Sequence, residues 1–135
     1  METIDKGTLM ITIDENNCKS VLFNPVNGTV WLTKCELVEL FGIYTQTINA
    51  CINTISNANI FRMDEVCKCH LIAKTGKNTI RYDPYKFSLE FIIAMAFRID
   101  SENSKLLRKW FLDEIIHSKA ILLRILVNKQ NYEWN

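Results

Sequence analysis

The sequence has no apolar run long enough to cross a membrane. Its longest runs, Phe91 to Phe97 and Ala120 to Val127, are far shorter than the roughly 20 residues that a membrane-spanning helix needs, and Arg124 interrupts the second. The first residues, Met1 to Gly7, also lack the basic start and the apolar stretch of a secretory signal. We therefore expect no membrane span, no export and a cytoplasmic location.

The sequence also lacks a disulfide framework and a strong net charge. Its five cysteines, at positions 18, 35, 51, 67 and 69, form an odd set without framework spacing, which is typical of reduced thiols. The net charge is only +1, so no global field draws the chain toward polyanions. Any surface for nucleic acid must therefore come from local clustering of basic residues.

What is present is the composition of a packed globular protein. Apolar residues make up 48% and charged residues 23% of the chain, which excludes general disorder. A chain of 135 residues suits one contiguous core rather than two. We expect a single α+β domain over residues 1–135, without internal repeats or linkers.

The first half of the chain predicts strands followed by two short helices. Residues 8–32 contain β-branched and aromatic runs separated by Asn, Pro and Gly, which predicts a small N-terminal antiparallel sheet. Residues 33–55 then have helical periodicity. Thr33 and Glu36 have capping-box spacing, Gly42 suits a left-handed helix end, and Thr45 is expected to cap a second helix that starts at Gln46.

The second half predicts a hairpin and two further helices. Residues 66–82 alternate with period two around the turn Thr75 to Asn78. Residues 86–98 are apolar nearly all round, which is typical of a buried helix. A cap at Ser101 to Ser104 predicts a long helix from about 102 to about 127, so that core and C-terminal helices together span 86–127.

Residues 34–55 have the pattern of a helix-turn-helix. The expected inward positions, grouped around the glycine turn, are Leu37, Val38, Phe41, Ile43, Ile48, Cys51 and Ile52. The exposed side of the second helix is polar and uncharged, and Gln and Asn can read adenine in the major groove. The candidate DNA base contacts are Tyr44, Thr45, Gln46, Thr47, Asn49 and Asn53. The alternative is an ordinary soluble helix face.

The hairpin 66–82 predicts a basic wing. Lys68, His70, Ile72 and Lys74 share one face, and pairing across the turn adds Arg81 and Thr79, while cysteines and apolar residues share the other. The segment from Arg62 to Lys86 contains six basic and three acidic residues, which gives it a local net charge of +3. The candidate phosphate contacts are Lys68, Lys74, Lys77 and Arg81. A solvated edge hairpin, where lysine is common, is the alternative.

Several of these segments resemble the N-terminal region of the virulence-associated RhuM family. The resemblance rests on Thr29 to Thr33, Glu39 to Ile43, Thr47-Ile48 and Val66 to Lys68, and covers most of residues 20–116. It implies a winged helix-turn-helix that binds DNA, of bacterial or mobile-element origin. This chain departs from the family in two ways: it stops where members continue, and its second helix lacks the usual basic residues.

The sequence does not favour catalysis. Strand alternation sends His70 to the opposite face from Cys67 and Cys69, which argues against a metal site. The segment Thr75 to Lys77 lacks the first glycine of a phosphate loop, and His117 lies beside acidic residues in a helical charge pair. We predict a non-enzyme without cofactor, metal or small-molecule ligand.

The partners that we predict are double-stranded DNA and a second copy of the chain. A single winged helix reads few base pairs, and an apolar stripe on the long helix offers a dimer interface: Leu112, Ile116, Ala120, Leu123 and Val127. The stripe could instead pack on the domain's own core. A transcriptional or phage-type regulator is the first functional hypothesis. A protein docking module without DNA binding and the regulatory half of a toxin system are the alternatives.

Overall fold

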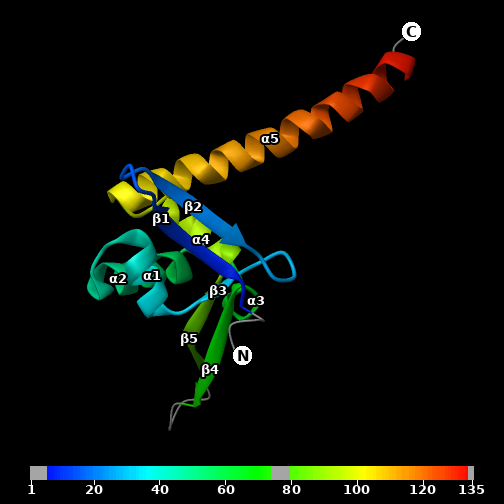
Figure 1. The fold of residues 1–135 in the computed structure, drawn as a ribbon. Coiled ribbons are helices and arrows are strands. Elements are labelled where there is room, and N and C mark those ends of the chain that lie inside the picture. The colour runs from blue at the N-terminus through cyan, green and yellow to red at the C-terminus, as the bar shows by residue number, and fades with distance from the viewer. Residues whose placement is uncertain (1–5, 74–79, 134–135) are drawn as a thin grey trace.

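The computed structural model describes the backbone of residues 6–73 and 80–133 and the side chains of residues 6–70 and 83–118. The predicted α+β class is confirmed for this part of the chain (Figure 1). Its elements follow the order β1 (Thr8–Ile13), β2 (Lys19–Asn24), β3 (Trp31–Leu32), α1 (Lys34–Phe41), α2 (Thr45–Asn57), α3 (Met63–Val66), β4 (Cys67–Ala73), β5 (Ile80–Ser88), α4 (Leu89–Ala96) and α5 (Glu102–Glu133).

The strands form two separate antiparallel sheets. β1 pairs with β2 as a hairpin, whereas β3 joins β4 and β5 in a second sheet with the order β3-β5-β4. The expected N-terminal antiparallel sheet is confirmed for β1 and β2, but the expectation that it extends to residue 32 is wrong. β3 leaves the hairpin because Trp31 pairs with Ser88 and Leu32 with Phe87, which buries Leu32 and Phe87 in the core.

Helix α1 begins and ends as predicted. The Thr33 hydroxyl accepts a hydrogen bond from the Glu36 amide at 3.3 Å, and the Glu36 carboxylate accepts one from the Thr33 amide at 3.1 Å. This capping box satisfies two amides that a helix start leaves without partners. Gly42 ends the helix in the left-handed region, with φ at 64°. Glycine suits this position because a side chain there is strained.

Helix α2 begins one residue earlier than predicted. Thr45 is its first residue and not its cap; Tyr44 occupies the cap position and makes no side-chain cap hydrogen bond. The first turn is held by the backbone instead, since the amides of Thr47 and Ile48 donate to the carbonyl of Tyr44. The short helix α3, which follows α2, had no counterpart among the expected elements.

The buried helix is shorter than expected because strand β5 continues to Ser88. Lys86 pairs with Lys68 and Phe87 pairs with Cys67, which holds these residues in the sheet. α4 therefore begins at Leu89 and not at residue 86. Its buried character is confirmed at Phe91, Ile92, Met95 and Ala96.

Hydrogen bonds from the side chains of Ser101 and Arg108 join α4, α5 and α1. The Ser101 hydroxyl accepts from the Ser104 amide at 3.1 Å, which confirms the predicted cap, and donates to the carbonyl of Phe41 at 2.8 Å. The Arg108 guanidinium donates to the carbonyls of Ala96 and Ile99, both at 2.8 Å. These contacts fix the loop between α4 and α5 against the end of α1.

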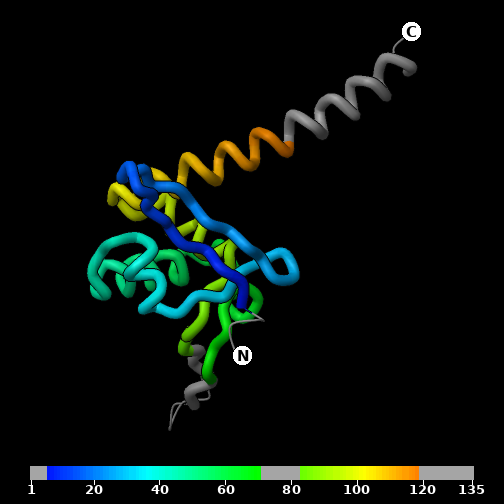
Figure 2. Tube along the Cα trace, in the orientation of Figure 1, coloured from blue at the N-terminus to red at the C-terminus, as the bar shows by residue number. Residues whose placement is uncertain are grey.

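Among the side chains described in α5, residues 102–118, those in the first turns pack on the domain. Ser104, Leu107 and Phe111 are buried, and Trp110 packs edge-on against Phe23 of β2 with ring centroids 5.2 Å apart. The β1–β2 hairpin thus lies beside the start of α5 (Figure 2). The helix then projects away from the rest of the fold (Figure 1).

Candidate nucleic-acid interface

The two helices of the predicted helix-turn-helix pack on the core through one face each. The buried positions are Leu37, Leu40 and Phe41 on α1 and Ile48, Cys51, Ile52 and Ile55 on α2. The predicted inward face is confirmed at most positions. Val38 is only half-buried, and Leu40, which the pattern did not single out, is buried in its place. The remaining face of α2 is left to solvent.

Five of the six predicted base contacts lie on this solvent-exposed side. Tyr44 is 83% exposed, and Thr45, Gln46, Thr47 and Asn53 are exposed as well. Asn49 is half-buried at the edge of the exposed face. The structure therefore brings together an uncharged surface in which polar side chains, centred on Gln46 and Asn53, surround the exposed Ala50.

The hairpin has the predicted register. Ile72 pairs with Arg81 and Ala73 with Ile80, as expected for a turn centred on residues 76 and 77. Lys68 is exposed on the outer face of the sheet. Lys74 and Lys77 lie outside the described residues, and so does the Arg81 side chain.

The outer face of the sheet also carries aromatic residues that the sequence analysis did not select. The Lys68 ammonium lies 4.9 Å from the centre of the Trp31 ring, and the His70 ring stacks on Tyr85 with centroids 4.1 Å apart. Tyr85 lies two positions beyond Asp83, the partner of His70, so alternation places it on the same face, and it is the extra residue of a bulge between Lys68 and Cys69. Tyr85 was missed because the predicted hairpin ended at residue 82, and Trp31 was missed because its place beside Lys68 depends on the pairing of β3 with β5.

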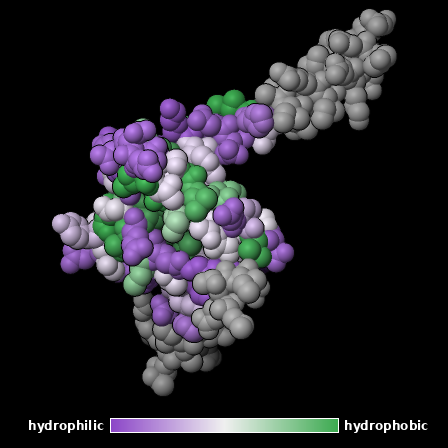
Figure 3. All heavy atoms as spheres, in the orientation of Figure 1, coloured by the Kyte–Doolittle hydropathy of each residue, from purple (hydrophilic) through white to green (hydrophobic). Residues whose placement is uncertain are grey.

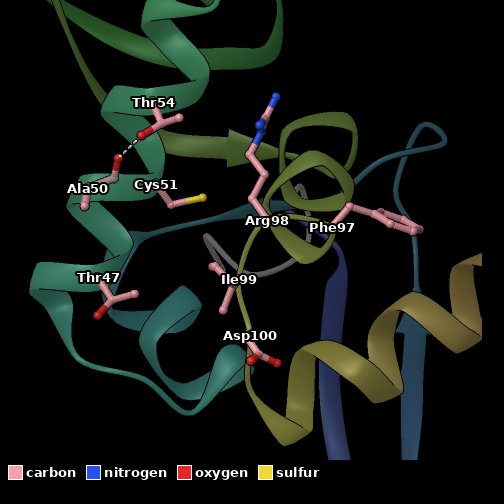
Figure 4. A pocket seen from close by; sticks show the side chains of 8 residues that line it. All are labelled: Thr47, Ala50, Cys51, Thr54, Phe97, Arg98, Ile99 and Asp100. Carbon is pink, nitrogen blue, oxygen red and sulfur yellow. Dashed lines mark hydrogen bonds between the residues drawn. The ribbon is translucent and has the colours of Figure 1, made fainter.

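A shallow groove separates α2 from the loop that follows α4. Its volume is about 500 Å³, and Figure 4 shows the residues that line it: Thr47, Ala50, Cys51, Thr54, Phe97, Arg98, Ile99 and Asp100. Only Cys51 and Ile99 are buried, while the other six are exposed. Arg98 was missed because it follows the end of α4 and belongs to no motif. It is also more than 40 positions from the end of α2 in the sequence, so only tertiary structure places it beside that helix.

The cysteines nearest these surfaces are held as neutral thiols. Burial, together with the neighbouring Cys69, raises the pKa of Cys67 to about 12. Burial also raises the pKa of Cys51 above its usual 9.0, although the Arg98 charge partly opposes this. A thiol with a raised pKa is a poor nucleophile at neutral pH. His70 is exposed while Cys67 is buried, as strand alternation predicted.

The structure describes the side chains of only two residues of the predicted dimer stripe. Leu112 is 45% exposed and Ile116 is 62% exposed, and the neighbouring Ile115 is 45% exposed. Figure 3 shows apolar surface between hydrophilic side chains on this part of α5. These residues do not pack on the domain's own core. The side chains of Ala120, Leu123 and Val127 lie outside the described residues.

Among the described residues, no helix is both long and apolar enough to cross a membrane, and no group of three His, Cys, Asp or Glu could hold a metal ion. Comparison of the chain with models of protein families, with curated proteins and with solved structures found no match.

Proposed function

We propose that this protein is a sequence-preferring, double-stranded DNA-binding domain of a transcriptional or mobile-element regulator. The observation that carries the proposal is the exposed polar face of α2, presented by a helix-turn-helix whose other face is buried. Helix-turn-helix proteins insert such a second helix into the major groove. The resemblance to the RhuM family supports the same function and an origin in bacteria or their mobile elements.

The sheet supports a winged form of this motif. α1 and α2 are inserted between β3 and the β4–β5 hairpin, and β3 pairs with β5, so the hairpin is anchored next to the helix pair. In the proposed complex the hairpin lies on the DNA backbone. Lys68, Lys74, Lys77 and Arg81 contact phosphates, which positions the protein without reading sequence.

Sequence preference is assigned to α2. Gln46 and Asn53 read base edges from the centre of the exposed face, with Asn49 at its margin and Tyr44, Thr45 and Thr47 around the first turn. Amide side chains can pair with adenine through two hydrogen bonds, each good pair giving roughly 1–3 kcal/mol of discrimination. A homodimer through α5 doubles the site that is read and matches a symmetric operator.

Selection from a random duplex library tests this assignment. The intact protein should enrich a defined sequence, and the Gln46→Ala and Asn53→Ala variants should each lose preference at one or two positions. Asn16→Ala removes an exposed amide in the β1–β2 turn and serves as the matched control. If both α2 variants enrich the same sequence as the intact protein, α2 does not read the bases.

One observation favours a protein docking module as the second candidate. Leu112, Ile115 and Ile116 are exposed on a helix that projects from the domain, and apolar surface of this kind marks interaction sites. The two candidates differ in what binds: a docking module recruits a protein through α5 and has no affinity for duplex DNA.

A further inference from the structure

The exposed face of α2 has no charge with which to hold the DNA backbone beside the bases that it reads. Every helix residue from Thr45 to Asn57 is uncharged. Base contacts alone leave the register of a helix in the groove poorly fixed, because phosphate contacts provide the positioning. A cation from another element next to α2 would supply what the helix lacks.

Arg98 occupies this position. It follows α4 and lines the groove beside α2, and its guanidinium extends along the Thr54 end of the groove (Figure 4). Among the side chains that the structure describes, no carboxylate pairs with Arg98. Burial raises the pKa of Cys51, which faces Arg98 across the groove, and the Arg98 charge reduces this rise.

The groove fits an extended strand better than a small molecule. Small-molecule sites enclose most of their ligand, whereas six of the eight residues here are exposed to solvent. The buried Cys51 and Ile99 form the floor, while Ala50 and Phe97, which is 48% exposed, lie on opposite rims. An exposed groove with a cation at one end and an apolar rim suits a sugar–phosphate chain.

The electrostatics of the groove are uneven. Asp100 lies at the end opposite the Arg98 guanidinium (Figure 4) and is exposed. The Cys51 thiol, neutral because burial raises its pKa, adds no negative charge to the floor. Phosphates are therefore favoured near Arg98 and Thr54 and disfavoured near Asp100.

We propose that this groove is a second phosphate-binding surface, in which Arg98 holds the DNA backbone strand that borders the bases read by α2. The inference rests on the proposed DNA binding. It adds a contact from the α4–α5 loop, so that the helix is anchored on one side by the loop and on the other by the wing. Asp100 opposes the contact and limits its strength.

Titrations of a mixed-sequence duplex with charge variants test this proposal. Arg98→Gln should weaken binding roughly tenfold for all sequences at about 50 mM salt, and should lower the salt slope by about 0.9 log unit per log unit of salt. Asp100→Asn should act in the opposite direction and tighten binding. Arg62→Gln is the matched control, because Arg62 is 73% exposed and already pairs with Asp64 and Glu65 at 3.3 and 3.6 Å. Circular dichroism melts confirm that each variant folds.

The outcomes separate the two proposals. If the intact protein binds duplex DNA and Arg98→Gln keeps both its affinity and its salt slope, the groove is not a phosphate site, while the proposed function stands. Equal weakening by Arg98→Gln and Arg62→Gln indicates a general charge effect and also overturns the inference. If the intact protein binds no duplex at all, both proposals are wrong.

Discussion

At the scale of single residues, Glu36 links the capping of α1 to the N-terminal segment. Its carboxylate accepts hydrogen bonds from the Thr33 amide and from the Lys6 ammonium. Burial raises the pKa of Glu36, but the hydrogen bonds from Lys6 and Thr33 and the Lys6 charge outweigh it, so the pKa lies below its usual 4.5. The ionised carboxylate therefore stabilises the folded chain.

The pH dependence of stability should show this contribution. A group whose pKa is lowered on folding stabilises above its unfolded pKa, and the contribution is lost as the pH falls through the folded pKa. Denaturant unfolding should therefore show a larger deficit for Glu36→Gln at about pH 7 than at about pH 3. Glu39→Gln, exposed on the same helix, is the control and should show no such difference. An equal deficit for Glu36→Gln at both pH values would contradict this role.

At the scale of elements, α4 is capped by a residue far away in sequence. The Leu89 amide donates to the Thr29 hydroxyl at 3.1 Å, although Ser88 occupies the cap position. The Ser88 hydroxyl is buried and has no hydrogen-bond partner among the described residues. Tertiary structure has thus moved the cap from the local serine to a threonine 60 positions away.

Two substitutions compare the contributions of the Thr29 and Ser88 hydroxyls to stability. Thr29→Val keeps the side-chain shape and removes the acceptor, so it should lower the free energy of unfolding by about 1 kcal/mol. Ser88→Ala removes a buried hydroxyl that makes no hydrogen bond among the described residues. The free energy of unfolding should therefore fall by less than about 0.5 kcal/mol, or rise. Urea unfolding midpoints measure both. A larger loss for Ser88→Ala than for Thr29→Val would show that the cap is local.

The same elements show what the sequence could predict. Local sequence was sufficient to predict the bounds of α1, since Thr33, Glu36 and Gly42 lie within ten positions of one another. It was also sufficient to predict the register of the hairpin, which follows from the position of the turn. The membership of β3 in the second sheet was missed because it depends on pairing between residues more than 50 positions apart. The extension of β5 to Ser88 was missed because the pairs that Lys86 and Phe87 form with β4 lie beyond a bulge in the hairpin, and Ser88 pairs with distant Trp31. For the candidate site, α2 and Lys68 came from periodicity. Arg98 and Trp31 join the surface only through tertiary packing, and Tyr85 lies beyond the predicted end of the hairpin.

At the scale of the whole molecule, the projecting helix requires an explanation, because it leaves the domain with apolar side chains exposed. Leu112 and Ile116 lie on the stripe that the sequence predicted, and both side chains are exposed there. We expect the chain to form a homodimer through residues 112–127. Pairing of two helices buries this stripe and places two copies of α2 on one DNA site.

Sedimentation equilibrium tests the dimer. The intact chain should be a dimer at micromolar concentration, and Ile116→Glu and Leu123→Glu should each convert it to a monomer, since a buried unpaired carboxylate is costly. His117→Glu, beside the stripe, is the control and should leave the dimer intact. A monomeric intact chain contradicts the prediction, and a dimer that survives both stripe variants places the interface elsewhere.

The salt dependence of duplex binding tests the central claim most directly. A labelled mixed-sequence duplex of about 25 base pairs is titrated with the intact protein between about 50 and 200 mM salt. With Lys68, Lys74, Lys77, Arg81 and Arg98 on phosphates, log K should fall linearly with log salt, with a slope of about −4.5 for each protomer. Lys74→Ala combined with Arg81→Ala should flatten that slope by about 1.8. Absence of binding at about 50 mM salt, or a slope near zero, would contradict a function in DNA binding.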